Sequence, residues 1–283
     1  NIGFPYFLRD LCRKLGFCGW LILHFLGNIL ATIKALRVIK SSQYNIVHCH
    51  ANLACVLLSY FNRNVKLIYT LHDSGPWLSH YDGFIQRIIR KLAFYNFDVR
   101  AVNRSQVTTV VFQLLKEHLI QQFSIPSKKI QVVSSGVDLL HFSESKIQER
   151  EYFIFIGQLT WRKGLDVLLT LAEKIEFFKL KIIGDGELAE WLLNEIEHRK
   201  LGSKVQFIGS VSRDKIVNYL HKAKALVLPS RADAMPLVVL ESLSCSVPVI
   251  ATNVGGIPEL VKHRHTGFIY QVDDLIGFED AIR

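Results

Sequence analysis

Short apolar segments alternate with helix-like segments along the whole of this 283-residue chain. An apolar segment of four to eight residues between turn residues is typical of a buried strand, and regular alternation with helices is typical of parallel sheets. Strands are expected at residues 45–50, 65–71, 107–111, 130–134, 152–156, 179–183, 204–209, 226–230 and 247–252. The pattern predicts the α/β class with doubly wound, Rossmann-like parallel sheets.

One polar stretch divides this pattern into two domains. Residues 1–145 and 146–283 each hold several expected strands, and both ranges have the usual size of a single domain. Residues 141–151 are polar and form the predicted linker. We therefore expect an N-terminal and a C-terminal Rossmann-like domain.

Residues 230–261 contain the densest group of candidate binding residues. Pro236 has no backbone N–H and a fixed φ, so it fits the first turn of a helix that continues to Cys245. The N–H groups at a helix start are unpaired and lie at its positive end, which suits phosphate or sugar oxygens. The candidate residues at this helix start are Ala234, Met235, Pro236, Leu237 and Val238.

Two carboxylates accompany this helix. Asp233 lies in the loop before it and Glu241 lies within it, so the two side chains project from different heights. Each carboxylate could accept hydrogen bonds from a pair of hydroxyl groups. The structural alternative is that Asp233 caps the helix and that Glu241 is an ordinary solvated residue.

This segment resembles the nucleotide-binding half of the GT-B glycosyltransferases, specifically the retaining glycosyltransferase family 4. The family pattern is E-x7-E, which corresponds to Asp233 and Glu241, with Asp in place of the usual first Glu. The resemblance implies that Asp233 contacts the donor sugar and that Glu241 holds the ribose hydroxyls. It also implies a GT-B fold, in which two Rossmann-like domains face a cleft.

The resemblance extends to residues 155–169, where an expected strand reaches Gly157 and a basic pair, Arg162 and Lys163, precedes a helix. A departing nucleoside diphosphate gains negative charge as the glycosidic bond breaks, and fixed cations stabilise that transition state more than the ground state. Arg162 and Lys163 resemble such a clamp. Without the flanking motifs they would be a solvated surface pair.

Gly184, Gly186 and Ala189 form the pattern G-x-G-x-x-A between an expected strand and a helix. This pattern also occurs in nicotinamide-binding domains, where an acidic residue about 20 positions later binds the ribose. No Asp or Glu occurs between Glu197 and Asp214. We therefore interpret the glycines as the similar loop of the glycosyltransferase family, which lies beside the nucleotide.

The following turn supplies further candidates. The backbone of residues 207–211, including Ile208, is expected near the nucleotide base, and Ser212 is expected to cap the next helix.

Two histidine groups occur in the first domain. His48 and His50 point to one face of an expected strand, and His72 with Asp73 follows the neighbouring strand. Together they could form a zinc site, although paired histidines on a strand are more often packed or hydrogen-bonded. The family resemblance instead implies that His72 lies at the floor of the interdomain cleft, supported by His50 and near Asp73 on the acceptor side, without a metal. The chain also has no D-x-D motif, the mark of metal-dependent glycosyltransferases of the other major fold.

The positive charge of the chain lies in its first half. Residues 1–150 carry 18 Lys and Arg and 8 Asp and Glu, a net charge of +10, whereas the remaining residues carry 16 and 17, a net charge of −1. This excess favours anionic partners such as lipid headgroups, a lipid-linked phosphate or an acidic polysaccharide. No nucleic-acid-binding motif accompanies it, so nucleic acid is not an expected partner.

Residues 15–33 are the most apolar part of the chain and are flanked by basic residues. His24 and Asn28 interrupt the run, which disfavours a membrane-spanning helix. A helix buried against the sheet and an interfacial helix are the two alternatives. The five scattered cysteines indicate free thiols in the cytoplasm, with the inner face of the membrane as a further possible location.

The family resemblance implies a metal-independent, retaining glycosyltransferase of the hexosyltransferase type, which needs no cofactor besides its nucleoside-diphosphate sugar. Its acceptor would be a glycan, a lipid-linked or another hydroxyl, in the synthesis of cell-surface polysaccharide or glycolipid. The family's first strand with its glycine-rich loop and its last helix are not recognisable in the chain, which suggests a trimmed sequence. A non-catalytic nucleotide-sugar-binding module and a nicotinamide oxidoreductase are the alternatives.

Overall fold

The computed structural model describes residues 16–41, 44–61, 65–72, 97–143 and 149–283, with side chains from residue 26 onward. The chain divides into two compact units, the first within residues 1–133 and the second comprising residues 134–283 with 112–114. The predicted domain boundary at residue 145 falls in 144–148, outside the described residues. Each unit is an α/β layer structure, as the alternation of segments predicts.

The first unit contains a four-stranded sheet in the order β1-β2-β3-β4, and all its strand pairs are parallel. Its strands are β1 (Ile46–Cys49), β2 (Lys66–Leu71), β3 (Val107–Val110) and β4 (Ile130–Val132). Its helical segments are α2 (Gly16–Ser41), α3 (Asn52–Phe61), α5 (Val99–Arg104), α6 (Gln113–Phe123) and the 3-10 turn η3 (Ser127–Lys129). Because β1 and β2 are parallel neighbours, the residues that follow them lie at the same edge of the sheet.

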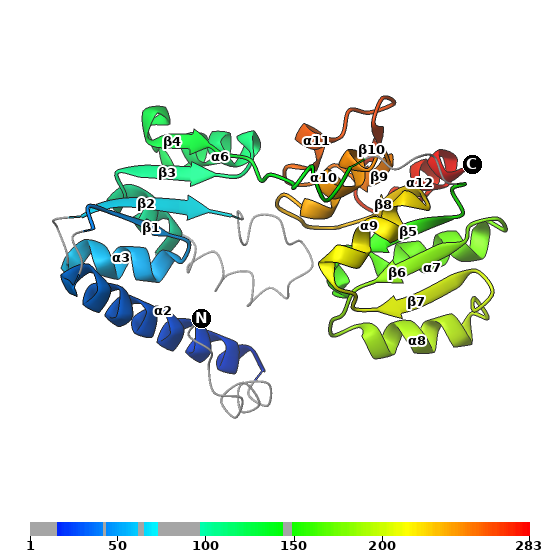
Figure 1. Ribbon diagram of the computed structural model, residues 1–283, viewed down its shortest axis with the longest axis horizontal. Helices are drawn as coiled ribbons and strands as arrows, with labels where there is room; N and C mark the ends of the chain where they lie inside the picture. The colour runs from blue at the N-terminus through cyan, green and yellow to red at the C-terminus, as the bar shows by residue number, and fades with distance from the viewer. Residues whose placement is uncertain (1–15, 42–43, 62–64, 73–96, 144–148) are drawn as a thin grey trace. The chain divides into compact units, whose positions relative to one another are not determined.

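Helix α2 runs alongside α3, as Figure 1 shows in blue. The side chain of Asn28 is buried, and its Oδ1 accepts a hydrogen bond from the Ala54 N–H at 3.1 Å. The side chains of Leu26 and Leu30 are exposed on the other side of the helix. Helix α2 thus buries one side, packs on α3 and continues to Ser41, while the interfacial alternative for its exposed side stays a prediction.

Among the described residues, none of the helices combines the length and the apolar character needed to cross a bilayer.

The second unit contains a six-stranded parallel sheet in the order β10-β9-β8-β5-β6-β7. Its strands are β5 (Tyr152–Ile156), β6 (Leu180–Ile183), β7 (Val205–Gly209), β8 (Ala223–Leu228), β9 (Val249–Thr252) and β10 (Gly267–Tyr270). Successive strands proceed to one side of β5 as far as β7, and then to the other side from β8 to β10. The switch point of this doubly wound sheet lies between β5 and β8.

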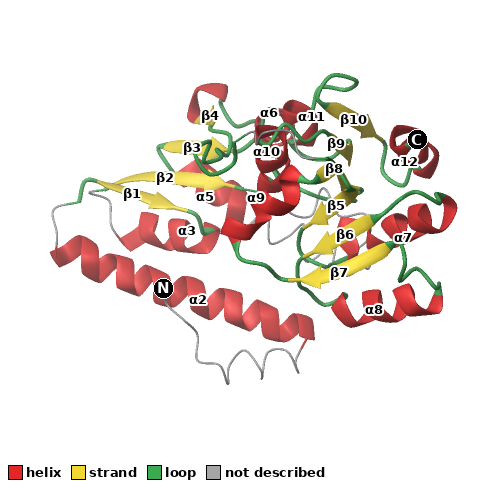
Figure 2. Cartoon of the chain, turned by 45° about the vertical axis from the view of Figure 1, so that its right-hand side comes forward, coloured by secondary structure: helices red, strands yellow, loops and turns green. Residues whose placement is uncertain are grey.

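Helices flank this sheet, as Figure 2 shows in red beside the yellow strands. They are η4 (Trp161–Lys163), α7 (Leu165–Lys174), α8 (Ala189–His198), α9 (Arg213–His221), α10 (Leu237–Ser244), α11 (Ile257–Leu260) and α12 (Leu275–Ile282). Every residue of β5 and β9 is buried. Coverage of both faces by helices explains why these strands are continuous apolar runs rather than alternating ones.

Candidate functional site

The carboxyl ends of the strands in the second unit carry most of the predicted site residues. Loops leave β5 at Gly157, β6 at Gly184 and β8 at residue 229, and the β8 loop leads into α10. In open parallel sheets ligands bind outside the carboxyl ends of the strands at the switch point, which here lies between β5 and β8. The tertiary structure thus gathers Gly157, the basic pair, the Gly-x-Gly loop and the start of α10 at one edge of the sheet.

The two glycines after β6 allow this loop to approach the β5 loop closely. Gly184 has a φ of +146°, and a Cβ atom on it would lie 1.8 Å from the carbonyl oxygen of Gly157. A Cβ on Gly186 would lie 2.4 Å from the carbonyl oxygen of Leu159. Any side chain at either position would push the loops apart. The two glycines therefore allow the β6 loop to pack against residues 157–159, which lead into the turn with the basic pair.

Lys163 and Asp233 form an ion pair between the β5 loop and the β8 loop. The Lys163 Nζ donates to Asp233 Oδ2 at 2.5 Å, and the Ser230 hydroxyl donates to the same oxygen at 3.3 Å. The other oxygen, Oδ1, receives no hydrogen bond from any residue in the described part of the chain. The pair thus presents one free carboxylate oxygen and an ammonium group, a combination that can bind both a hydroxyl group and an anion.

Arg162 precedes Lys163 in the same 3-10 turn. Its side chain is partly exposed, and no ion pair to it is found among the described residues. The two neighbouring cations therefore differ: Lys163 is paired with a carboxylate, whereas the Arg162 guanidinium can bind a ligand.

The start of α10 is an open helix end. Pro236 occupies the N-cap position with φ −69° and ψ 118°, and the helix begins at Leu237, one residue later than predicted. The N–H groups of Leu237 and Val238 donate to no group in the described residues, whereas Val239 N–H bonds to the Pro236 carbonyl at 3.1 Å. Asp233 does not cap this helix. The unpaired N–H groups at the positive helix end favour an anion or a sugar oxygen there.

Glu241 is buried within α10, with 6% of its surface exposed, and is not the solvated residue of the structural alternative. Arg213 at the start of α9 donates from Nη2 to Glu241 Oε1 at 3.0 Å. Burial raises the pKa of Glu241 above its ordinary value, while the charge of Arg213 opposes that shift. A carboxylate held by one guanidinium keeps its second oxygen for a ligand.

The remaining predictions in this unit concern the end of β7. Ile208 is partly buried in β7, and the N–H of Gly184 donates to the Gly209 carbonyl at 3.0 Å, which joins the β6 loop to the end of β7. Ser212 takes the N-cap position of α9, but its hydroxyl makes no capping bond, so the predicted side-chain cap is wrong.

The histidines of the first unit form a hydrogen-bonded group at the ends of β1 and β2. His50 Nδ1 and His72 Nε2 lie 2.8 Å apart, whereas His48 Nε2 lies 2.6 Å from the Thr70 hydroxyl. Burial, and after it the neighbouring histidines, lowers the pKa of both His48 and His72. Among the described residues no group of three ligands could hold a metal ion, and Asp73 lies outside them.

Sequence reasoning missed two arginines. Arg213 immediately follows the helix-capping position that was predicted, and Arg231 lies between the predicted strand and Asp233. Arg231 is buried and donates to Asp166 and Asp273. The signal for Arg231 was its position, because a charged residue directly after a buried strand of a parallel sheet faces the ligand-binding edge.

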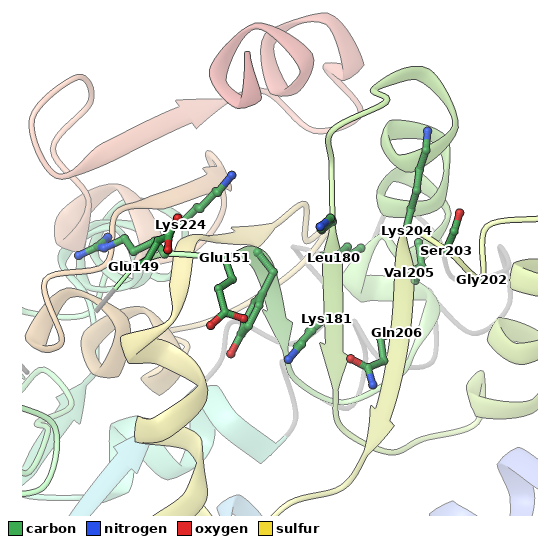
Figure 3. Close-up of a pocket in the computed structure, with 13 residues that line it drawn as sticks. Glu149, Glu151, Leu180, Lys181, Gly202, Ser203, Lys204, Val205, Gln206 and Lys224 are labelled. Carbon is green, nitrogen blue, oxygen red and sulfur yellow. The ribbon is translucent and has the colours of Figure 1, made fainter. Parts of the chain in front are cut away.

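A hollow of about 670 Å³ lies at the opposite edge of the same sheet, where β5 to β8 begin (Figure 3). Two of its cations serve local structure: the Lys181 Nζ lies 4.0 Å from the centre of the Tyr152 ring, and the Lys204 Nζ donates to the Ala172 carbonyl at the end of α7. None of the predicted site residues lines it. We place the candidate functional site at the carboxyl edge of the sheet because the predicted site residues of this unit converge there.

Two family models together match almost the entire chain. The model for "Glycosyl transferases group 1" matches residues 137–283, and the model for "Glycosyltransferase Family 4" matches residues 6–140. The chain belongs to the group 1 glycosyl transferases. The family models thus agree, in both halves of this glycosyl transferase chain, with the family that its sequence motifs indicated.

Curated relatives and solved structures agree with this family. The chain is 27% identical over 265 residues to the N-acetyl-alpha-D-glucosaminyl L-malate synthase of Bacillus anthracis, covering 87% of this chain and 66% of that protein. It is 25% identical over 304 residues to an Escherichia coli UDP-Gal:alpha-D-GlcNAc-diphosphoundecaprenol alpha-1,3-galactosyltransferase, covering 98% of this chain and 73% of the relative. The chain spans 62% to 66% of the length of five curated relatives.

The fold is also that of solved glycosyltransferases. The structure of Anabaena HepE in complex with UDP superposes with a TM-score of 0.70 at 20% identity, covering 87% of this chain and 70% of that one. The two parallel-sheet units are thus those of the GT-B fold, as predicted.

Proposed function

We propose that this protein is a retaining glycosyltransferase of the hexosyltransferase type, which transfers a sugar from a nucleoside-diphosphate sugar to a hydroxyl acceptor. The observation that carries the proposal is the contact of Lys163 with Asp233 between the loops after β5 and β8, beside the open start of α10. This edge of the sheet offers cations, free N–H groups and carboxylates together. Those are the groups that a diphosphate and a sugar require.

Each group has a role in this proposal. Arg162, Lys163 and the N–H groups of Leu237 and Val238 neutralise the diphosphate, in place of a metal ion. Their stabilisation grows as the glycosidic bond breaks and charge moves to the leaving phosphate. Asp233 accepts hydrogen bonds from the donor sugar, and Glu241 accepts them from the ribose hydroxyls.

The chemistry needs no nucleophile from the protein. The acceptor oxygen forms its bond to the anomeric carbon on the face from which the diphosphate departs, and a diphosphate oxygen takes the acceptor proton. His72, whose ring is held by His50 at 2.8 Å, belongs to the acceptor side of the reaction. Its lowered pKa keeps the imidazole neutral near pH 7, so that it can accept a hydrogen bond from a hydroxyl group.

The positive first half suits an acceptor on an anionic membrane surface at the cytoplasmic face. Lys34, Arg37 and Lys40 follow the exposed side chains of Leu26 and Leu30 along α2, and α2 contains no acidic residue. Cations beside apolar side chains favour peripheral binding to anionic lipid. Sedimentation with anionic and with neutral vesicles tests this part, and equal binding to both would contradict it.

The E. coli relative is named for both a UDP-sugar and a lipid diphosphate. By analogy with this relative, we propose that the protein acts in the synthesis of cell-surface polysaccharide or glycolipid.

Calorimetric titration of the protein with UDP, GDP, ADP and NAD tests the proposed function. We expect binding of a nucleoside diphosphate and no binding of NAD. NAD binding without a response to any diphosphate would overturn the proposal in favour of an oxidoreductase. Donor binding without transfer to a panel of glycan and lipid-linked acceptors, and without donor hydrolysis, would indicate a non-catalytic binding module instead.

A further inference from the structure

Arg231 is the most completely enclosed cation at the carboxyl edge of the second sheet, with 6% of its side chain exposed. Its Nη1 and Nη2 donate to the two carboxylate oxygens of Asp166, each at 2.7 Å. Its Nε donates to Asp273 Oδ1 at 3.0 Å. The guanidinium therefore connects the loop after β8 with the first turn of α7 and with the loop after β10.

Arg231 also holds the backbone of the 3-10 turn that carries the basic pair. Its backbone N–H donates to the Arg162 carbonyl at 2.7 Å, and its Nη1 donates to the Trp161 carbonyl at 3.3 Å. Its guanidinium carbon lies 5.1 Å from the centre of the Trp161 ring. One residue thus fixes the turn from both the main chain and the side chain.

A buried guanidinium is costly to desolvate unless its charge and its donors are satisfied. Asp166 accepts in the bidentate geometry that only arginine offers, and this hydrogen bonding raises the pKa of Arg231 above its ordinary value. A buried ion pair contributes little net stability compared with apolar packing, but it fixes geometry. Such a group at a ligand-binding edge is therefore explained better by positioning than by stability.

The turn and the β8 loop each contribute one partner of the Lys163 and Asp233 contact. Arg231 lies two residues before Asp233 and bonds to the residue before Lys163. Without the guanidinium, the two loops would be joined in this described region only by the backbone bond from the Arg231 N–H to the Arg162 carbonyl, a weaker one from the Ala232 N–H and the flexible lysine side chain. A displacement of about 1 Å in a binding group can change rates or affinities by about a hundredfold.

We propose that Arg231 is a positioning residue for the diphosphate-binding cations, holding Arg162 and Lys163 at a fixed distance from the β8 loop. This inference rests on the proposed function. In this role Arg231 acts through the neighbouring loop and not through contact with the sugar donor. Loss of Arg231 should therefore weaken binding of the phosphates more than binding of the nucleoside.

Calorimetric titration with UDP, GDP, ADP and the matching monophosphates tests this role. The nucleotide bound most tightly by the wild type is used for every variant, and the ratio of monophosphate to diphosphate Kd is compared. We expect Arg231→Gln to weaken diphosphate binding ~10- to 100-fold and monophosphate binding ~3-fold or less, so that the ratio falls. A merely structural role would weaken both together and leave the ratio unchanged.

Two further variants keep the test valid if Arg231→Gln folds poorly. Arg231→Lys retains the charge without the planar fork, so it should restore the ratio only in part. Asp166→Asn leaves Arg231 in place but weakens the bidentate contact, and its ratio should fall in the same direction.

Arg199→Gln is the matched control. Arg199 also donates to two carboxylates, Glu195 at 2.6 Å and Glu173 at 3.2 Å, but these lie on α8 and α7. We expect no change of the ratio in this variant. An unchanged ratio in the folded Arg231 variants would overturn the positioning role alone. Failure of the wild type to bind any of the diphosphates would overturn the proposed function and this inference with it.

Discussion

The Lys163 Nζ lies 2.5 Å from Asp233 Oδ2, although 70 residues separate the two in the chain. The contact joins two adjacent loops of a parallel sheet at its switch point. The pair therefore links the two loops, and in the proposed function a ligand phosphate would share the lysine with the carboxylate.

Replacing Lys163 by Met should weaken nucleoside-diphosphate binding by about 10- to 100-fold, because one charge-assisted contact worth about 1.5–3 kcal/mol is lost. Calorimetry measures the effect directly. Lys181→Met is the matched control, since Lys181 lies at the opposite edge of the same sheet. Equal losses in the two variants would show that net charge, and not the position of Lys163, determines affinity.

Replacing Gly184 by Ala should destabilise the second unit by about 3 kcal/mol or more, through backbone strain and steric overlap. The new Cβ would lie 1.8 Å from the Gly157 carbonyl oxygen at a φ of +146°. Gly202→Ala is the control, because a Cβ there meets no atom within 4 Å. Chemical denaturation gives both free energies of unfolding, and similar values for the two variants would contradict the close approach of the loops.

Replacing Glu241 by Gln should change how stability depends on pH. The pKa of Glu241 is raised by burial, so the folded protein keeps this proton above pH 4.5, where the unfolded chain releases it. The wild type therefore loses stability through this group as the pH rises. We expect the stability of Glu241→Gln relative to the wild type to increase between pH ~4 and ~7 in denaturant titrations. A relative decrease over that range would contradict the buried position of the carboxyl.

The stability contributed by the histidine group should depend on pH in the opposite direction. Burial, followed by the charge of neighbouring histidines, lowers the pKa of His48 and His72, so the unfolded chain takes up protons first as the pH falls below 6.5. Stability is then lost in acid. The double variant His48→Asn, His72→Asn should lose less stability than the wild type between pH ~7.5 and ~5.5 in thermal melts. An identical acid loss would show that other groups cause it.

The local sequence determined the helices and strands and indicated most of the candidate site residues. Short apolar runs such as residues 152–156 are strands because a segment buried on both faces needs no polar alternation. The sequence predicts Gly184, Pro236 and Glu241 as candidate residues because the pattern of a few neighbouring residues indicates the backbone conformation or the charge needed at each position. Helix caps were less predictable, because α10 begins one residue after Pro236, within the usual variation of helix ends, and Ser212 takes the N-cap position of α9 without a side-chain bond.

Only the tertiary structure decided which of these residues meet. Lys163 pairs with Asp233, and Arg231 with Asp166 65 residues away, because β5 and β8 are neighbours in the strand order. Local periodicity defines a strand but does not specify its neighbour, which depends on how all the helices and strands bury their apolar faces together. The partners of a buried charge therefore could not be derived from the sequence by itself, whereas the chemistry of the individual site residues could.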